Sequence, residues 1–312
     1  MAARGQAQAR LRSSFVTNNP PGRACPPIIY GIGLGTPAHV IDTLTGMLAR
    51  YRRRIGSRWR AYDTWLQAVL TCAWLEGGHT YQQLADGNSI SRETCRRYIC
   101  EGVKVLARRA LPLTEVVRLA ARAGWPYLIV DGVNIPTQRV AAKFTAKQHW
   151  YSGKHHRHGA AVQTVAAPDG ELLWVSGVLP GKTVDIRAAR RFGIAEKVLE
   201  FLGMLADLGY IGLDPQVIVG WKRTRGQTTL PEGKKTANRL IASLRAIGER
   251  ANAQLRQWRI LASDFRGHPR QLTVVVKAVQ ALQYMIRDPF GRDINTDLLQ
   301  QSTVHKRPVK TR

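Results

Sequence analysis

The hydrophobic pattern of the chain changes near Trp125, and this change limits the possible folds more than any other feature. Before Trp125, apolar residues recur at helical spacing, and after it short apolar runs alternate with turn residues. Residues 128–130, 160–166 and 172–178 read as strands, and Pro168-Asp169-Gly170 is typical of a hairpin turn between the last two. We therefore expect an all-helical N-terminal region followed by an α/β domain.

Carboxylates stand at distinctive places in the predicted α/β domain. Asp131 ends the apolar run 127–130, Asp207 ends the run 201–206, and Glu249 lies in a long helix predicted for residues 235–258. Each has an ordinary explanation, because Asp131 and Asp207 both precede residues that are common in turns. Glu249 could equally pair with Arg245 on a solvated helix face.

The order of these elements is more specific than any one of them. A strand with Asp131, a hairpin, a helix, a strand with Asp207, a loop and a helix with Glu249 match a ribonuclease H-like fold. In that fold the first strand and a later parallel strand hold their carboxylates side by side. The fold class expected is an α/β ribonuclease H-like domain preceded by an all-α region.

The charge of the chain indicates what such a site would act on. The chain of 312 residues has 47 Lys and Arg against 21 Asp and Glu, a formal net charge of +26. So basic a chain points to nucleic acid first, and to other RNA-binding roles or an acidic membrane surface second. Carboxylates in a protein that binds polyanions suggest phosphoryl transfer with two Mg²⁺ or Mn²⁺ ions per site, since magnesium prefers oxygen ligands.

Composition argues against membrane and secreted proteins. No run of about 18 apolar residues occurs, and no apolar segment follows the basic N-terminus, so we expect neither a transmembrane helix nor a secretory signal. The four cysteines lack metal-ligand spacing and read as reduced thiols. These features favour a cytoplasmic, nucleoid-associated protein with no membrane partner.

The N-terminal half predicts a helix-turn-helix near residues 79–108. Thr80 can cap a short helix that ends near Gly87, and Ser91 can cap a longer one. The second helix would present a basic face to DNA; its residues are Arg92, Arg96 and Arg97. Any short helical hairpin gives the same pattern, so the basic charge of the chain carries part of this prediction.

The helix that contains Glu249 has a predicted buried stripe, to which Glu249 does not belong. The stripe consists of Leu240, Leu244, Ile247, Ala251, Leu255 and Trp258. Glu249 instead lies beside three residues that could contact DNA, namely Arg245, Asn252 and Arg256.

A second basic segment, around residues 143–158, is expected to touch phosphates near the site. Its candidate DNA-binding residues are Lys154, His155 and Arg157. The histidines of this segment could form a zinc site instead, but they have no cysteine partner and no helical spacing. Trp150 and Tyr151 could stack on an unpaired base or anchor the loop.

Asp185 is a rival carboxylate. It follows a Pro-Gly turn and could serve as a metal ligand, orient the site, or cap the helix that begins near Ile186.

Linked motifs resemble the DDE superfamily endonucleases of bacterial insertion-sequence transposases, most closely a branch related to Harbinger-type transposases. The resemblance covers roughly residues 35–287. The motifs are Val130-Asp131-Gly132-Val133-Asn134-Ile135-Pro136, Tyr151-Ser152-Gly153-Lys154-His155, Leu179-Pro180-Gly181-Lys182-Thr183-Val184-Asp185, Leu205-Ala206-Asp207-Leu208-Gly209-Tyr210 and Ile247-Gly248-Glu249-Arg250-Ala251-Asn252. In this family Lys or Ser often follows the second aspartate, where this chain has Leu208.

The resemblance implies a DNA transposase with Asp131, Asp207 and Glu249 as its metal-binding catalytic triad. It would cut double-stranded DNA at terminal inverted repeats and join the 3′ hydroxyl to target DNA, as a homodimer or larger assembly. Two alternatives stay open: a catalytically silent DNA-binding protein, and a nuclease without strand transfer. The domains expected are a flexible basic leader (1–34), a helical DNA-binding region (35–122), a catalytic domain (123–288) and a polar basic tail (289–312).

Overall fold

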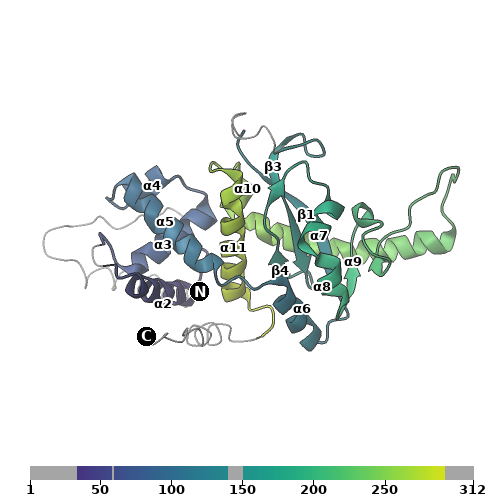
Figure 1. The fold of residues 1–312 in the computed structure, drawn as a ribbon, viewed down its shortest axis with the longest axis horizontal. Coiled ribbons are helices and arrows are strands. Elements are labelled where there is room, and N and C mark those ends of the chain that lie inside the picture. The colour runs from purple at the N-terminus through teal and green to yellow at the C-terminus, as the bar shows by residue number, and fades with distance from the viewer. Residues whose placement is uncertain (1–33, 58–59, 140–149, 292–312) are drawn as a thin grey trace, which may run out of the picture. The chain divides into compact units, whose positions relative to one another are not determined.

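The computed structural model describes residues 34–57, 60–139 and 150–291 (Figure 1). Nearly all of the predicted leader and tail, and the part of the basic segment from 140 to 149, lie outside the described residues. The chain forms two compact units, Met1–Gly102 and Val103–Arg312. The division comes earlier than the expected boundary at residue 122, because the helix that ends there packs on the sheet of the second unit.

The first unit is helical. Its helices are α2 (Ala38–Arg54), α3 (Thr64–Gly77), α4 (Tyr81–Asp86) and α5 (Arg92–Ala107), which continues into the second unit. Capping residues mark the starts of α4 and α5 and the end of α3. Thr80 and Gln83 form a reciprocal capping box on α4, and the Ser91 hydroxyl accepts the Thr94 N–H at 3.1 Å at the start of α5. Gly78 ends α3 in the left-handed conformation. The predicted caps at Thr80 and Ser91 are confirmed.

A mixed sheet organises the second unit, with strand order β2-β3-β1-β6-β7. β1 is antiparallel to β3 and parallel to β6, and β6 is parallel to β7. β4 and β5 pair with different parts of β3. The strands are β1 (Tyr127–Pro136), β2 (Tyr151–Ser152), β3 (Arg157–Ala166), β4 (Leu172–Val175), β5 (Leu179–Pro180), β6 (Gly203–Leu205) and β7 (Val217–Ile218).

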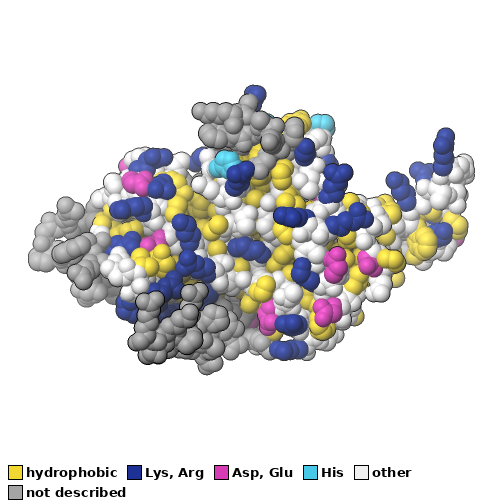
Figure 2. Space-filling model, viewed as in Figure 1, with side chains coloured by type: hydrophobic (Ala, Val, Ile, Leu, Met, Phe, Trp, Pro, Cys, Tyr) yellow, Lys and Arg dark blue, Asp and Glu magenta, His cyan; other side chains and the backbone are white. Residues whose placement is uncertain are grey.

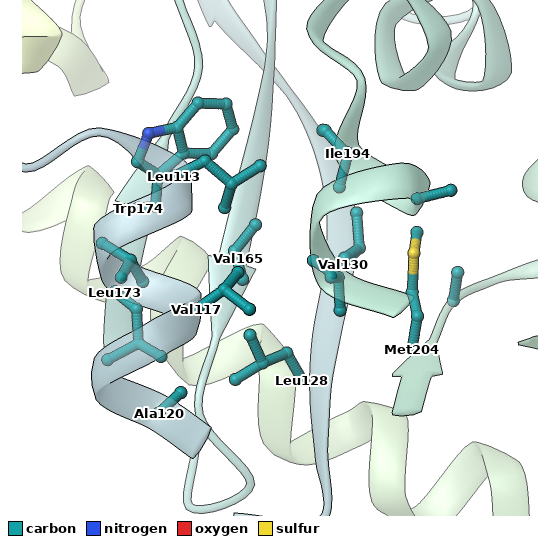
Figure 3. Packing of buried hydrophobic residues seen from close by; sticks show 14 of the residues in the cluster. Leu113, Val117, Ala120, Leu128, Val130, Val165, Leu173, Trp174, Ile194 and Met204 are labelled. Atoms are coloured by element: carbon teal, nitrogen blue, oxygen red, sulfur yellow. The ribbon is translucent and has the colours of Figure 1, made fainter. Parts of the chain in front are cut away.

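Helices cover the two faces of this sheet. Three helices, α6 (Leu113–Arg122), α7 (Asp185–Phe192) and α8 (Ile194–Leu199), pack on one face and enclose the main core. Figure 3 shows Leu113, Val117 and Ala120 of α6 beside strand residues that include Leu128 and Val165. The second unit also contains the helices α9 (Glu232–Gln257), α10 (Arg259–Ala262) and α11 (Leu272–Arg287). Helix α9 contacts β1, β3 and β4, α10 contacts β1, and α11 contacts β4. Two 3₁₀ turns, η2 (Leu208–Tyr210) and η3 (Pro269–Gln271), complete the described fold.

Only the C-terminal half of α9 packs on the sheet. Its buried residues begin at Gly248, whose missing side chain lets the helix approach Ile129 closely. The predicted stripe is therefore wrong in its first half, since Leu240 is 62% exposed and Leu244 and Ile247 are only partly buried. Figure 1 shows this half of the helix extending beyond the sheet.

The first strand is longer than the sequence suggested. Asp131 lies in the middle of β1 and not at its end, because residues 132–136 continue to pair with β3. The interpretation of Asp131-Gly132 as a turn is therefore wrong. The hairpin turn at residues 168–170 is confirmed, with the Gly170 N–H donating to the Ala167 carbonyl at 2.9 Å and Gly170 at a φ of 88°.

Candidate active site

Parallel pairing of β1 and β6 brings Asp131 and Asp207 to neighbouring strands. Ile129 pairs with Leu205, so each aspartate stands two residues beyond the same registered pair. β6 ends at Leu205, and Asp207 turns the chain by accepting the Gly209 N–H at 2.8 Å. The two carboxylates interact electrostatically, since Asp207 contributes to raising the pKa of Asp131. The register thus gives the two aspartates the same offset from one registered pair, and their role as shared metal ligands stays a prediction.

Asp131 is held by hydrogen bonds from its own strand and from α9. Its Oδ2 accepts from Asn252 Nδ2 at 2.8 Å, and its Oδ1 accepts the Gly132 N–H at 2.9 Å. Asn252 is oriented in turn by the Thr164 hydroxyl at 3.0 Å. Burial raises the pKa of Asp131 above its ordinary value, and the two hydrogen bonds and Arg245 oppose this shift.

Glu249 lies on the same flank of α9 as the residues that face Asp131. It follows Arg245 by four positions and precedes Asn252 by three, and residues at these spacings are neighbours on a helix surface. Arg245 and Asn252 both act on Asp131, whereas Glu249 is exposed to solvent. Glu249 therefore shares a helix flank with the two residues that act on Asp131.

Asp185 approaches β1 from the other face of the sheet. A side chain at Gly132 would meet Asp185 Oδ1 at 1.8 Å, so Asp185 occupies the space that Gly132 leaves open. Successive residues of a strand point to opposite faces, and the Asp131 side chain therefore lies across the strand from Asp185. Asp185 is the first residue of α7 and does not cap it with its side chain, so the capping interpretation is wrong.

A buried polar chain holds Asp185 in place. Gln163, paired with Gly132 across the strands, donates from Nε2 to Asp185 Oδ1 at 3.3 Å and accepts from the Tyr210 hydroxyl. Lys154 Nζ lies 3.5 Å from Asp185 Oδ2. Burial raises the pKa of Tyr210, and the nearby carboxylates of Asp185, Asp131 and Asp207 add to the shift. Tyr210 is therefore joined to Asp185 through Gln163.

Asp131, Asp207 and Glu249 offer the type of ligand that binds divalent cations, but the three side chains do not converge on one point. Among the ion pairs of the described residues, none involves Asp131, Asp207 or Glu249, in a chain with a large excess of cations. Hard oxygen atoms on partly buried carboxylates suit Mg²⁺ or Mn²⁺. Within the described ranges, however, no three Asp, Glu, His or Cys side chains come close enough to hold a metal ion together.

The other predicted DNA-binding residues of the second unit lie on α9, on β3 and in the turn before β3. Arg157 and Arg256 line one pocket of about 30 Å³ together with Asn134. Burial lowers the pKa of the His155 imidazole, and the nearby charges of Lys154 and Arg157 lower it further. His155 is therefore less often charged than an ordinary histidine. Trp150 is buried and T-stacked on His268, which favours anchoring, whereas Tyr151 is 47% exposed.

The three arginines of the predicted recognition helix are exposed on the first turns of α5. Arg96 forms a bidentate pair with Glu93, with a shortest N–O distance of 2.6 Å.

Sequence reasoning missed Gln163, Thr164 and Tyr210. The first two are polar residues at the centre of the otherwise apolar run 160–166, and both are almost completely buried. Buried polar side chains need partners, so this interruption was the available indication that β3 contributes to the site.

Comparison with known proteins decides the family. Residues 130–283 match the family model described as DDE superfamily endonuclease. The chain is 30% identical over 196 residues to a protein of Streptomyces albus G named "Putative transposase for insertion sequence element IS112", covering 62% of this chain and 70% of that protein. The chain belongs to the DDE insertion-sequence transposases.

This membership makes the protein a transposase-type nuclease whose substrate is DNA. The family implies a ribonuclease H-like fold, with which the mixed sheet of the second unit agrees. The relationship to the Harbinger branch stays a prediction. No solved structure matches the chain significantly. Within the described residues, no helix is long and apolar enough to span a membrane.

Proposed function

We propose that this transposase cuts DNA at the ends of its element and joins the freed 3′ hydroxyl to target DNA, using Asp131, Asp207 and Glu249 as metal ligands. One observation carries the proposal. Ile129 of β1 pairs with Leu205 of the parallel strand β6, and Asp131 and Asp207 each lie two residues after this pair. Both lie in the part of the chain that matches the endonuclease family, and neither forms a salt bridge among the described residues.

The chemistry required is phosphoryl transfer without a covalent protein intermediate. When bound, two Mg²⁺ or Mn²⁺ ions supply the activation of the attacking oxygen and the stabilisation of the leaving oxygen. Asn252 and the Gly132 N–H fix the orientation of the Asp131 carboxylate. Glu249 would complete the ligand set from the exposed flank of α9, where a side chain can adjust without disturbing the core.

The predicted DNA-binding residues of the second unit would bind the phosphate backbone. Guanidinium and ammonium groups neutralise phosphates and position the strand without reading its sequence. This role falls to Lys154, Arg157, Arg245 and Arg256, while His155 and Asn252 would add uncharged hydrogen-bond donors. Asp185 is better suited to position Lys154 and Gln163 than to share a metal with Asp131, because it approaches β1 from the opposite face.

The helices α4 and α5 would hold the terminal inverted repeat as a helix-turn-helix, with Arg92, Arg96 and Arg97 toward DNA. Support comes from the capped pair of helices and from the exposure of all three arginines. Pairing of two element ends calls for a homodimer or larger assembly, and a protein that acts on chromosomal DNA would associate with the nucleoid.

The experiment is a nicking and strand-transfer assay with purified protein and duplexes that carry the element ends. Replacing Asp131 or Asp207 with Asn, or Glu249 with Gln, should lower the cleavage rate by roughly 10²–10⁴ or more while DNA binding persists. EDTA should abolish cleavage, and Mg²⁺ or Mn²⁺ should restore it. Glu196→Gln, an exposed carboxylate on α8, is the matched control and should cut normally.

Each alternative function has its own outcome in this assay. Normal cutting by the Asp207→Asn protein would show that the triad is wrong. Binding of the correct ends by the wild-type protein without any nicking would identify a silent DNA-binding protein. Nicking without joined products would identify a nuclease that lacks strand transfer.

A further inference from the structure

The segment from Ile218 to Ile247 contains no buried residue, although it lies between two packed parts of the second unit. Val217 before it and Gly248 after it are both buried. We call residues 221–239 the basic arm. The N-terminal part of α9, residues 232–247, extends beyond the sheet and is about 24 Å long at the usual rise per residue (Figure 1).

The basic arm is a defined structure. Asn238 fastens its two sides, because its Oδ1 accepts the Trp221 N–H at 2.7 Å and its Nδ2 donates to the Trp221 carbonyl at 2.9 Å. Lys234 Nζ lies 4.4 Å from the centre of the Trp221 ring. A turn follows, in which the Gln227 N–H donates to the Thr224 carbonyl at 3.1 Å. These contacts hold the arm as one unit.

Nearly all charged residues of the basic arm are positive. It contains six Lys or Arg residues and a single acid, Glu232, which pairs with Lys235 at 2.7 Å. Three of the cations, Lys222, Arg225 and Arg239, are exposed and have no carboxylate within ion-pair distance among the described residues. Figure 2 shows Lys and Arg side chains along the projecting part of the molecule.

Such an arm is not explained by the stability of the fold. An isolated helix of this length is marginal in water, and most helices in proteins gain their stability from packing a buried face. Here the exposed half of α9 has no buried face, and its like charges repel one another. A polyanion along the arm would neutralise these charges.

We infer that the basic arm is a binding surface for duplex DNA that contacts backbone phosphates and does not read bases. The inference deepens the proposed function, on which it rests for the identity of the polyanion. Cations spaced along a helix and a turn fit the phosphates of a duplex, and phosphate contacts carry no sequence information. The arm therefore contributes equally to the binding of element ends and of unrelated DNA.

The test measures equilibrium binding of the full-length protein to short fluorescein-labelled duplexes by anisotropy, without divalent metal. Replacing Lys222, Arg225 and Arg239 together with Gln should make the slope of log K against log salt less steep by about 2–3 and weaken binding about tenfold or more. An element-end duplex and a scrambled duplex should lose affinity by the same factor.

Two matched variants separate the arm from general charge effects. Replacing Arg118, Arg122 and Arg191 with Gln removes the same charge from α6 and α7 and should leave the slope near that of the wild type. Exchanging the three arm residues for the other cation (Lys222→Arg, Arg225→Lys, Arg239→Lys) should also retain the slope.

Three results would overturn the inference: an unchanged slope for the arm variant, an equal loss for the α6 and α7 variant, or a loss confined to one duplex. An unchanged slope combined with dissociation of an oligomer in sedimentation would assign the arm to a second copy of the chain. Because no metal is present, these results are independent of whether Asp131, Asp207 and Glu249 cut DNA.

Discussion

Replacing Gly132 with Ala tests how closely α7 and β1 are fitted beside the site. Gly132 does not need its conformational freedom, because its φ is not positive. The effect of the substitution therefore comes from the added methyl group, which would lie 1.8 Å from Asp185 Oδ1 and 2.5 Å from Asp185 Cγ. Asp185 must retreat by roughly 1.5 Å to reach ordinary contact, which breaks its 3.3 Å hydrogen bond from Gln163.

The expected cost follows from overpacking. Extra methyl groups in packed positions destabilise by about 1–3 kcal/mol, which corresponds to roughly 2–4 °C in Tm per kcal/mol for a unit of this size. Urea unfolding of Gly132→Ala, Asp185→Ala and the double variant measures the coupling. The double variant should be more stable than the sum of the single effects predicts, since Asp185→Ala removes the obstacle.

Gly233→Ala is the control, because a methyl group there meets nothing within 4 Å and the residue is in a helix. It should be neutral or slightly stabilising. If Gly132→Ala unfolds at the wild-type urea concentration, or if its effect and that of Asp185→Ala simply add, the close approach of Asp185 to β1 is refuted.

Two further predictions concern single side chains. Asn252→Ala removes the hydrogen-bond donor to Asp131 Oδ2. Cleavage kinetics should show nicking slowed about tenfold or more, while the Kd for DNA measured by anisotropy stays within a few-fold of the wild-type value. Unchanged kinetics would exclude a role of Asn252 in orienting Asp131. Burial lowers the pKa of Lys277 to about 8, so between pH 8 and 10.5 the unfolded chain binds more protons than the folded chain. The free energy of unfolding should therefore rise with pH across this window by up to about 3 kcal/mol. Lys277→Met should lose this rise, and an equal rise in both proteins would assign it to other groups.

Local chemistry made the helix ends predictable from the sequence. Thr80, Ser91 and Gly78 act within one turn of the chain, so their roles could be read from neighbouring residues. The parallel neighbours β1 and β6 also followed from element order. The stripe on α9 failed because periodicity shows which side of a helix is apolar, but not how far along the helix a partner extends.

The site was less predictable, because its contacts join residues distant in sequence. Gln163 and Thr164 reach the carboxylates only through the register between β1 and β3. Asp185 was recognised as a competitor, but the face from which it approaches depends on the alternation of β1 and on the absence of a side chain at Gly132. A one-residue error in strand register would reverse that assignment.

The alternation at Asp131 and Gly132 also governs which changes of chain length β1 can accept. Adjacent residues serve opposite layers: Asp131 belongs with α9, and Gly132 with α7. Inserting or deleting one residue before them would exchange the layers, directing the carboxylate toward Asp185 and leaving Asn252 without its acceptor. A chimera that joins β1 to the start of a related enzyme must therefore keep Asp131 on the face of the sheet that contacts α9, even where the sequence of the strand is free to vary.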